Sequence, residues 1–364
     1  MYSIPLSAVS GSAVLLTQDL FKTKNAKTAH GLVRGSERFQ IWGVIDQAAA
    51  GNDAGMLLDG IERGIPIEAT INDFLVKQKQ KPDYVIIGAA FHGGRLPQGW
   101  EEILLEYLEK GISIVNGLHD LLSHRPSLVE AAKKYNAKLI DVRKPLPFEE
   151  LHFWNGSIFD VKVPIVASLG IDCNVGKMTT CRMLLEVCRE ANLATEMIYT
   201  GQTGWMQGYP YGFIFDATLN DFVSGELENA IVQCHKDLSP DLILLEGQSG
   251  LRNPSGPCGA ELILSGNAKG VVLQYTPFRG YYDGCEAWDC QLPDVLEEVS
   301  LIEKYGAEVL AITLNGELHS VPKLVEYKHS LMRRTAIPII CPLEEGGMQA
   351  ALPHIERYRQ RFLF

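Results

Sequence analysis

Short apolar runs alternate with longer amphipathic stretches along the first part of the chain. Runs that are rich in β-branched residues and bounded by Gly, Asp or Asn predict strands, and amphipathic stretches between them predict helices. This alternation is typical of a parallel sheet covered by helices on both faces. We therefore expect an α/β, Rossmann-like domain over residues 1–145, with strands at Ala13–Thr17, Phe39–Asp46, Asp83–Ala89, Ile112–Val115 and Lys138–Val142 and helices at Ile71–Lys79, Trp100–Lys110 and Ser127–Tyr135.

The alternation stops at residues 146–162, which are rich in Pro and aromatic residues and read as a linker. It resumes at Val163–Leu169, so we expect a second parallel-sheet domain over residues 163–364. A helix should follow from about Lys177 to Ala191. Further strands are expected at Thr195–Tyr199, Leu242–Glu246, Gly270–Tyr275, Val309–Leu314 and Ile337–Ile340, and further helices at Glu226–His235, Leu292–Tyr305 and Pro322–Arg333.

Composition narrows the classes of partner. The 364 residues include 33 Lys and Arg against 44 Asp and Glu, a formal net charge of -11. Such a chain repels nucleic acid and anionic membranes, so we expect neither as a main partner, and a small-molecule substrate instead. No stretch approaches the roughly 20 apolar residues of a membrane span. The eight cysteines form no CxxC pair, which suits reduced thiols in the cytoplasm. We also expect a homo-oligomer.

The strongest chemical signal is the sequence GIDCNVGKMTT, which follows the strand predicted to end at Leu169 and opens a helix. Glycines let successive backbone N–H groups face an anion, the helix N-terminus adds positive charge, and a lysine adds a cation. Five residues, rather than the standard four, separate its two glycines. The alternative is a glycine-rich turn without a ligand. We expect a P-loop whose cofactor-binding residues are Gly170, Asp172, Cys173, Asn174, Val175, Gly176, Lys177, Met178, Thr179 and Thr180.

One position departs from phosphate-transferring P-loops. The residue after their lysine is Ser or Thr, whose hydroxyl binds magnesium. Here it is Met178, and a thioether is a poor ligand for a hard cation. Thr179 or Thr180 could substitute, but each lies further round the helix. This pattern favours a cofactor that is held by its phosphates and left uncleaved, such as coenzyme A.

The loop resembles that of dethiobiotin synthetase and its relatives, which reads like Gly-Thr-Asp-x-x-Val-Gly-Lys-Thr. The segment DLILLEGQSG also resembles the apolar strand of that superfamily that ends in Glu-Gly-x-Gly-Gly. The resemblance implies that Glu246 serves a magnesium ion, if one is used, and that Asn315 reads an adenine. The alternative for Glu246 is a helix cap, and for Asn315 an ordinary strand end.

Other candidates follow predicted strands, where open α/β sheets bind ligands. Gln202 and Thr203, in the glycine- and aromatic-rich stretch Thr200–Tyr211, are candidate substrate residues, unless this is an ordinary surface loop. Asp216 and Asp221 could bind a metal or an amine, or could cap a helix. Arg279 could hold a carboxylate or phosphate, or could lie in an exposed loop.

The whole chain resembles a family of two-domain, P-loop-containing bacterial proteins long carried as a domain of unknown function. The resemblance rests on the Rossmann-like first half, GIDCNVGKMTT, Tyr199–Gly204 and EGQSGL. It implies transfer of an acetyl group from acetyl-CoA to the amine of a D-amino acid, with D-glutamate as the expected acceptor. Acidic residues near the loop could position or deprotonate that amine, so our catalytic candidates are Glu246, followed by Asp216 and Asp221. Two alternatives stay open. One is a ligase that uses ATP and magnesium to activate a carboxylate, and the other is a non-catalytic nucleotide-binding regulator.

Overall fold

A computed structural model of the chain describes residues 9–316, 320–343 and 346–362. The chain divides into two compact units. Unit 1 comprises the residues up to Pro145 together with Gln202–Tyr209, and unit 2 comprises Leu146–Gly201 and the residues from Pro210 onward. Among the residues described, no helix has the length and apolarity needed to cross a membrane.

Unit 1 contains a six-stranded parallel sheet with the strand order β3-β2-β1-β4-β5-β6. The order reverses next to β1, as expected for a Rossmann-like sheet. Its strands are β1 (Gly11–Leu16), β2 (Phe39–Ile45), β3 (Ile67–Glu68), β4 (Tyr84–Ile87), β5 (Ser113–Asn116) and β6 (Leu139–Asp141). Its main helices are α1 (Lys27–Arg34), α2 (Ala54–Asp59), α3 (Ile71–Gln78), α4 (Trp100–Glu109), α5 (Pro126–Lys134) and α7 (Gln202–Gln207).

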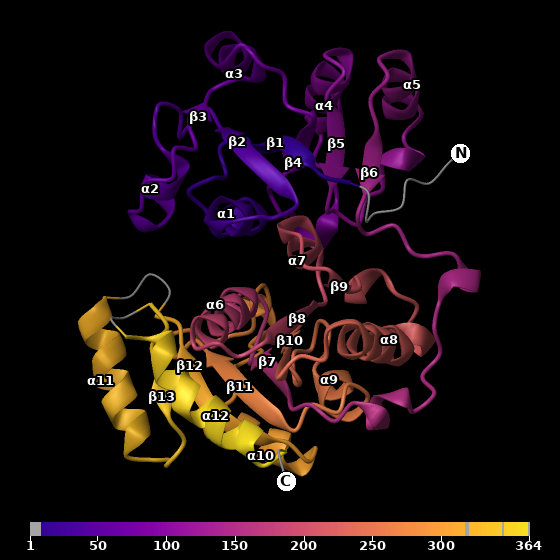
Figure 1. Ribbon diagram of the computed structural model, residues 1–364. Helices are drawn as coiled ribbons and strands as arrows, with labels where there is room; N and C mark the ends of the chain where they lie inside the picture. Colours follow the sequence, from indigo (N-terminus) through magenta and orange to yellow (C-terminus); the bar gives the residue numbers. More distant parts are fainter. Residues whose placement is uncertain (1–8, 317–319, 344–345, 363–364) are drawn as a thin grey trace. The chain divides into compact units, whose positions relative to one another are not determined.

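Helices cover both faces of this sheet. The side chains of Val14 and Leu16 belong to a core that includes Phe74 of α3, Leu104 of α4 and Leu128 of α5. The helices α1 and α2 lie on the opposite face (Figure 1). Strand residues alternate between the two faces, so both sides of the sheet are buried.

The helix α7 belongs to unit 1 although it follows β8 of unit 2 in sequence. It packs on α1, and the ring of its Trp205 lies under the guanidinium of Arg38 at 4.3 Å. The backbone carbonyls of Trp205 and Met206 accept hydrogen bonds from Arg38 Nε and Ser36 Oγ. The stretch Thr200–Tyr211 is therefore no simple surface loop. Its apolar side chains form a helix because α1 and its neighbours bury them.

Unit 2 contains a seven-stranded parallel sheet with the order β13-β12-β11-β7-β10-β8-β9. Its strands are β7 (Ile165–Gly170), β8 (Thr195–Tyr199), β9 (Tyr211–Gly212), β10 (Leu242–Glu246), β11 (Gly270–Tyr275), β12 (Glu308–Leu314) and β13 (Ile339–Ile340). Its main helices are α6 (Lys177–Glu190), α8 (Asn220–Leu238), α9 (Ala260–Leu264), α10 (Val295–Lys304), α11 (Val321–Met332) and α12 (Leu352–Gln360).

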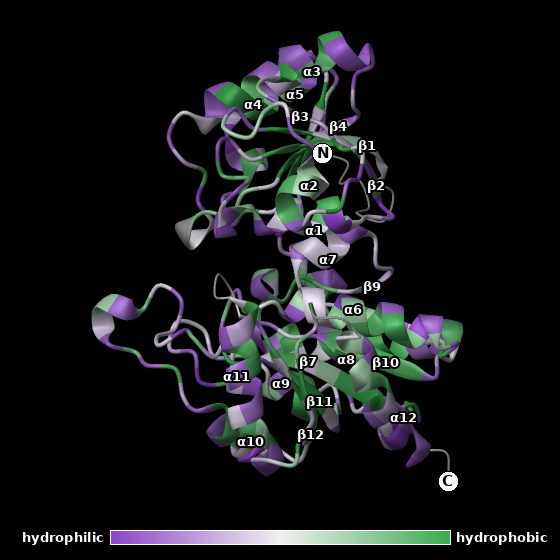
Figure 2. Ribbon diagram, turned by 90° about the vertical axis from the view of Figure 1, so that its left-hand side faces the viewer, coloured by the Kyte–Doolittle hydropathy of each residue, from purple (hydrophilic) through white to green (hydrophobic). Residues whose placement is uncertain are grey.

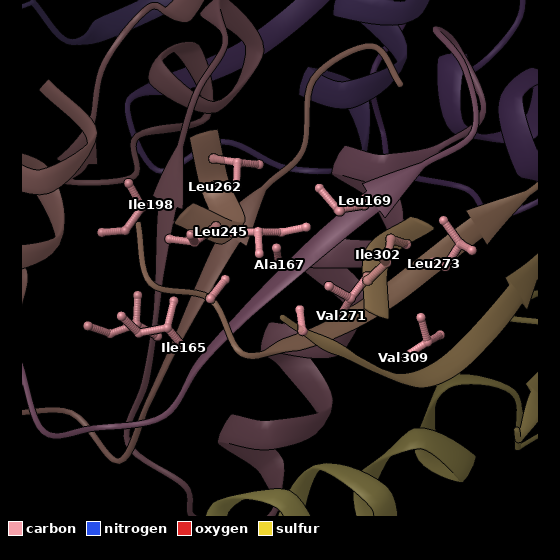
Figure 3. Packing of buried hydrophobic residues seen from close by; sticks show 14 of the residues in the cluster. Ile165, Ala167, Leu169, Ile198, Leu245, Leu262, Val271, Leu273, Ile302 and Val309 are labelled. Atoms are coloured by element: carbon pink, nitrogen blue, oxygen red, sulfur yellow. The ribbon is translucent and has the colours of Figure 1, made fainter. Parts of the chain in front are cut away.

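Alternate residues of β7 face different helices. Ile165, Ala167 and Leu169 pack into one apolar core with Leu262 of α9 and Ile302 of α10 (Figure 3). From the other face, α6 packs on β7, β8 and β10. The strands of both units carry mostly hydrophobic residues, while the helices mix hydrophobic and hydrophilic ones (Figure 2). The central strand that precedes the P-loop is thus fixed on both sides by packing.

Residues 146–162, which the sequence predicts to be a linker, form part of unit 2. Two buried carboxylates of α8 accept hydrogen bonds from backbone amides of this segment. Glu226 accepts the amide of His152 at 2.6 Å, and Glu228 accepts the amides of Asn155 at 2.7 Å and Ile158 at 3.1 Å. The segment is therefore attached to α8, and Pro and aromatic content alone did not reveal this.

The predicted fold class of two parallel-sheet α/β folds is confirmed. The predicted strands of both halves are present, with ends that differ by a few residues. The helix expected at Glu226–His235 is longer, at Asn220–Leu238.

Candidate functional site

The P-loop lies at the carboxyl end of β7, between the neighbouring strands β10 and β11. Gly170 ends the strand, and the first hydrogen bond of α6 runs from Thr180 N to Gly176 O at 2.9 Å. The amides of residues 177–179 therefore precede the hydrogen-bonded part of the helix, where its dipole is positive. Asn174 (φ 55°) and Gly176 (φ 104°) are both left-handed. Such residues turn successive N–H groups toward one side, which forms an anion-binding concavity.

The side chain of Lys177 lies across this loop. It is 7% exposed, and its Nζ donates hydrogen bonds to Asp172 O at 2.5 Å and to Ser249 O at 2.7 Å. The ammonium is thus held between the P-loop and the segment that follows β10. A lysine at this position of a P-loop supplies the cation for a bound phosphate.

Asp172 orders the loop from within. It is fully buried, and its Oδ1 accepts hydrogen bonds from Cys173 N at 2.6 Å and Asn253 Nδ2 at 2.7 Å. Its Oδ2 accepts hydrogen bonds from Asp283 N at 2.7 Å and Arg279 Nη1 at 2.9 Å. With four donors on two oxygens, this carboxylate is fully engaged by the protein. Asp172 therefore helps to hold the P-loop in its shape through these four hydrogen bonds.

Arg279, a predicted substrate residue, is bound to the P-loop. Its Nη1 also donates to Cys173 O at 2.8 Å, and the guanidinium is largely buried beside Asp172. In the same loop, Asp283 Oδ2 accepts Asn174 Nδ2 at 2.6 Å. The loop between β11 and α10 therefore holds one side of the P-loop.

Asn315 also contacts the P-loop. It follows β12, and its Nδ2 donates to Val175 O at 3.0 Å. The side chain of Val175 is buried in the core. The side-chain amide of Asn315, which the sequence predicts to bind an adenine, therefore donates a hydrogen bond to a backbone carbonyl of the P-loop.

The residues after Lys177 do not form a magnesium site. Thr180 Oγ1 donates to Gln274 Oε1 inside the sheet, and that oxygen also accepts Thr313 Oγ1 at 2.8 Å. Met178 and Thr179 are half-buried. Within residues 9–316, 320–343 and 346–362, no group of three or more His, Cys, Asp or Glu could hold a metal ion. The misfit to magnesium rests on the residues after the lysine: Met178 offers a thioether where P-loops offer a hydroxyl, and the Thr180 hydroxyl is already bonded to Gln274.

Glu246 ends β10 and is 5% exposed. Burial raises the pKa of its carboxyl to about 7, and the charge of Asp216 adds to this. The amides of Thr200 and Gly201 and the charge of Lys177 act in the opposite direction. Thr200 N donates to Glu246 Oε2 at 2.9 Å. A carboxyl with this pKa exchanges a proton near neutral pH, which suits a general acid or base.

Two glycines allow the segment after Glu246 to lie against the P-loop. A Cβ atom on Gly247 would overlap the carbonyl oxygen of Ser168, and one on Gly250 would overlap that of Ile171. Both obstacles are backbone atoms, which cannot rotate away. Between these glycines, the carbonyl of Ser249 accepts the hydrogen bond from Lys177.

The other predicted site residues lie in different surroundings. Asp216 is exposed in a short 3-10 helix, and its negative charge contributes to the raised pKa of Glu246. Asp221 is exposed in the first turn of α8, where a carboxylate complements the helix dipole. Gln202 and Thr203 begin α7 of unit 1, and Thr203 packs next to Gly31 of α1. These two residues thus belong to unit 1, whereas the P-loop belongs to unit 2.

Asn253 is a site residue that sequence reasoning missed. Its buried side chain donates to Asp172 and, through Oδ1, accepts Ser255 N at 2.8 Å. The only local signal was Asn-Pro-Ser-Gly, which is typical of a turn. Nothing in that pattern indicates contact with the P-loop.

Comparisons with known proteins agree with this arrangement. Residues 152–351 match the DUF1611 P-loop domain, described as a domain of unknown function, and residues 47–145 match the DUF1611 N-terminal Rossmann-like domain. A crystal structure of a DUF1611 family protein from Anabaena variabilis has a TM-score of 0.85 and 25% identity. The match between the two covers 96% of this chain and 100% of the Anabaena protein's chain.

Two curated relatives carry a functional name. A protein from Pseudoalteromonas sp. named D-glutamate N-acetyltransferase is 28% identical over 277 residues, which cover 72% of this chain and 78% of that protein. A protein of the same name from Tritonibacter scottomollicae is 27% identical over 281 residues, with the same shares covered. Because the P-loop model matches more than half of the chain, and the predicted resemblance is thereby confirmed, this protein belongs to the DUF1611 family.

Proposed function

We propose that this protein is an N-acetyltransferase that transfers the acetyl group of acetyl-CoA to the amine of a D-amino acid, with D-glutamate as the preferred acceptor. The observation that carries the proposal is Glu246, a buried carboxyl with a pKa of about 7 in the same unit as a P-loop that has Met178 in place of the usual magnesium-binding hydroxyl. Two relatives named D-glutamate N-acetyltransferase support the choice of reaction and acceptor.

The P-loop would bind the donor. The backbone amides of residues 177–179 and the ammonium of Lys177 would hold the pyrophosphate of coenzyme A, in place of the carbonyls that Lys177 now contacts. Asp172, Asn253, Arg279 and Asn315 would keep the loop in this shape through the hydrogen bonds described above. The phosphates would remain intact, so no cation is needed to stabilise a transferring phosphoryl group.

Glu246 would act as the general base. An amino acid reaches the site mostly as an ammonium ion, and its nitrogen must lose a proton before it can attack. A carboxylate with a pKa near 7 accepts that proton more readily than an ordinary glutamate would. Acetyl-CoA supplies the thioester carbonyl that becomes the new amide. The proton released by the amine then resides on Glu246 until solvent or the departing thiolate takes it.

The proposal is tested with the purified full-length chain, acetyl-CoA and D-glutamate. The expected result is N-acetyl-D-glutamate, identified by chiral chromatography with mass spectrometry, together with one free CoA thiol per product. L-Glutamate and a mixture without acceptor serve as controls, and magnesium chelation should leave the rate unchanged. Absence of acetylated product with every D-amino acid, combined with ADP formation from ATP and magnesium, would instead support the carboxylate-activating ligase.

A further inference from the structure

The loop between β11 and α10 carries two cysteines in a turn that brings them together. A short 3-10 helix (Glu286–Trp288) ends at Asp289, which is left-handed with φ 52°. Cys290 N donates to Cys285 O at 3.5 Å, and Asp289 N donates to Glu286 O at 3.2 Å. These two hydrogen bonds define a Schellman motif, in which the side chains of the first and sixth residues commonly touch. Cys285 and Cys290 occupy those two positions.

The backbone holds this turn closed at its base. Tyr281 and Gln291 form an antiparallel bridge, and Tyr282 N donates to Cys290 O at 3.0 Å. Cys285 N in turn donates to Tyr282 O at 2.9 Å. Both cysteines are thus fixed by hydrogen bonds to the same residue, Tyr282, so their backbones cannot separate without breaking the turn.

The two thiols differ in their access to solvent. Cys285 is buried, whereas Cys290 is partly exposed and its Sγ donates to Trp288 O at 3.7 Å. Burial and the proximity of Cys290 raise the pKa of the Cys285 thiol. Of the eight cysteines, all of which lie in the described residues, only Cys173 and Cys290 are not buried. Of the two cysteines in this turn, an oxidant in solution would therefore reach Cys290 first, because Cys285 is protected from the solvent.

We propose that Cys285 and Cys290 form a redox modification site that closes into a reversible disulfide. A hydroperoxide oxidises the Cys290 thiolate to a sulfenic acid, with loss of the alcohol or water. The Cys285 thiol then attacks that sulfur, forms the S–S bond and releases the sulfenic oxygen as water, so two thiols lose two electrons and two protons to one peroxide. The proposal does not depend on the acetyltransferase function.

The site lies in the loop that holds the P-loop. Asp283, whose amide binds Asp172, is two residues before Cys285, and Arg279 lies in the same loop. A disulfide within a turn that already places the two cysteines together should leave these contacts in place. Oxidation would thus add a covalent restraint to the native loop without unfolding it.

Intact-protein and peptide mass spectrometry test this inference. The folded full-length protein is treated with a small excess of hydrogen peroxide, then denatured, alkylated and digested with trypsin. Both cysteines fall in the tryptic peptide 280–304, which contains no other cysteine. The expected result is loss of two hydrogens from this peptide, no alkylation of either cysteine, and full reversal by dithiothreitol.

Three variants and a melting measurement make the outcome decisive. Cys290→Ser should abolish the loss of two hydrogens, Cys285→Ser should leave Cys290 as a trapped sulfenic acid, and Cys173→Ser should behave as the wild type. The oxidised wild type should melt at the same temperature as the reduced form or higher. A disulfide that maps elsewhere, a Cys290 that is oxidised while Cys285 still alkylates, or a lower melting temperature would overturn the proposal.

Discussion

Each unit places a buried acidic residue at the end of a strand beside its central strand, yet the two acids have different surroundings. Asp46 follows β2 in unit 1. Its Oδ2 accepts Thr17 Oγ1 at 2.7 Å and Phe21 N at 3.0 Å, and its Oδ1 accepts Ala49 N at 3.0 Å. In a dinucleotide-binding Rossmann fold, this position binds a ribose hydroxyl. Here its oxygens are used to hold the turn after β1.

Glu246 has the corresponding place beside β7 in unit 2. Its carboxylate accepts hydrogen bonds from the backbone amides of Thr200 and Gly201, and burial raises its pKa to about 7. The comparison teaches that a Rossmann-like topology does not by itself create a site. The two acids differ in their partners: two backbone amides and a threonine hydroxyl donate to Asp46, whereas Glu246 is held by two backbone amides and burial raises its pKa. We therefore expect a structural role for Asp46 and reserve the proposed catalytic role for Glu246.

The largest expected effect comes from Glu246→Gln. If Glu246 is the general base, the variant should lose about 10²- to 10⁴-fold in kcat while keeping its affinity for the donor. In the wild type, kcat/KM should rise with pH through an apparent pKa near 7, because the base must be deprotonated. Initial rates between pH 5 and 9 measure both. A variant with wild-type kcat and the same pH profile would remove Glu246 from the mechanism.

The same carboxyl should make folding stability depend on pH. Its folded-state pKa of about 7 lies above its ordinary value of 4.5. Its contribution is therefore fully present below about pH 4.5 and is lost as the pH rises through 7. Relative to Glu246→Gln, the wild type should lose on the order of 3 kcal/mol of unfolding free energy over that interval. Urea titrations at several pH values measure the difference, and parallel curves would contradict it.

Lys177→Ala should weaken binding of a polyphosphate ligand by about 10- to 150-fold, since a hydrogen bond to a charged group contributes about 1.5–3 kcal/mol. Lys77→Ala is the matched control in unit 1, because its exposed ammonium pairs only with Glu68 among the described contacts. Calorimetric titration with CoA measures both. Equal affinities for the two variants would show that the loop does not hold phosphates through this lysine.

Asp46→Asn tests the other side of the comparison. The amide nitrogen would face backbone and hydroxyl donors, so we expect a loss of about 1–3 kcal/mol in unfolding free energy. Donor affinity should stay unchanged. Asp73→Asn, at an exposed helix start, is the control with a smaller expected loss. A stable Asp46→Asn protein with impaired ligand binding would instead place Asp46 in a site.

The smallest expected effect is that of Met178→Thr. A hydroxyl at this position would restore the common magnesium ligand of P-loops. Because the proposed reaction leaves the phosphates of the cofactor intact, we expect no gain in magnesium-dependent ATP binding or hydrolysis. A clear magnesium-dependent gain would favour the ligase.

The sequence predicted those features whose signals are local. The β7 strand, the P-loop and the start of α6 are adjacent in sequence, so their order and residue types were sufficient. The contacts that hold the loop could not be predicted in this way. Asn253 and Asp283 reach Asp172 across 81 and 111 residues of chain, and each lies in a segment that reads only as a turn. Likewise, the position of Glu246 was predictable, but its pKa depends on burial by the complete sheet.

The excursion of the chain through α7 has a practical consequence for dividing the protein. The polypeptide leaves unit 2 after Gly201, supplies α7 to unit 1, and returns at Pro210. A fragment cut after Pro145 would therefore lack the helix whose Trp205 packs on Arg38 and Phe39. Without it, the surface around these two side chains would be exposed to water. Expression of the first half should yield an aggregation-prone product unless residues 202–209 are grafted onto it, so the two halves are not independent genetic modules.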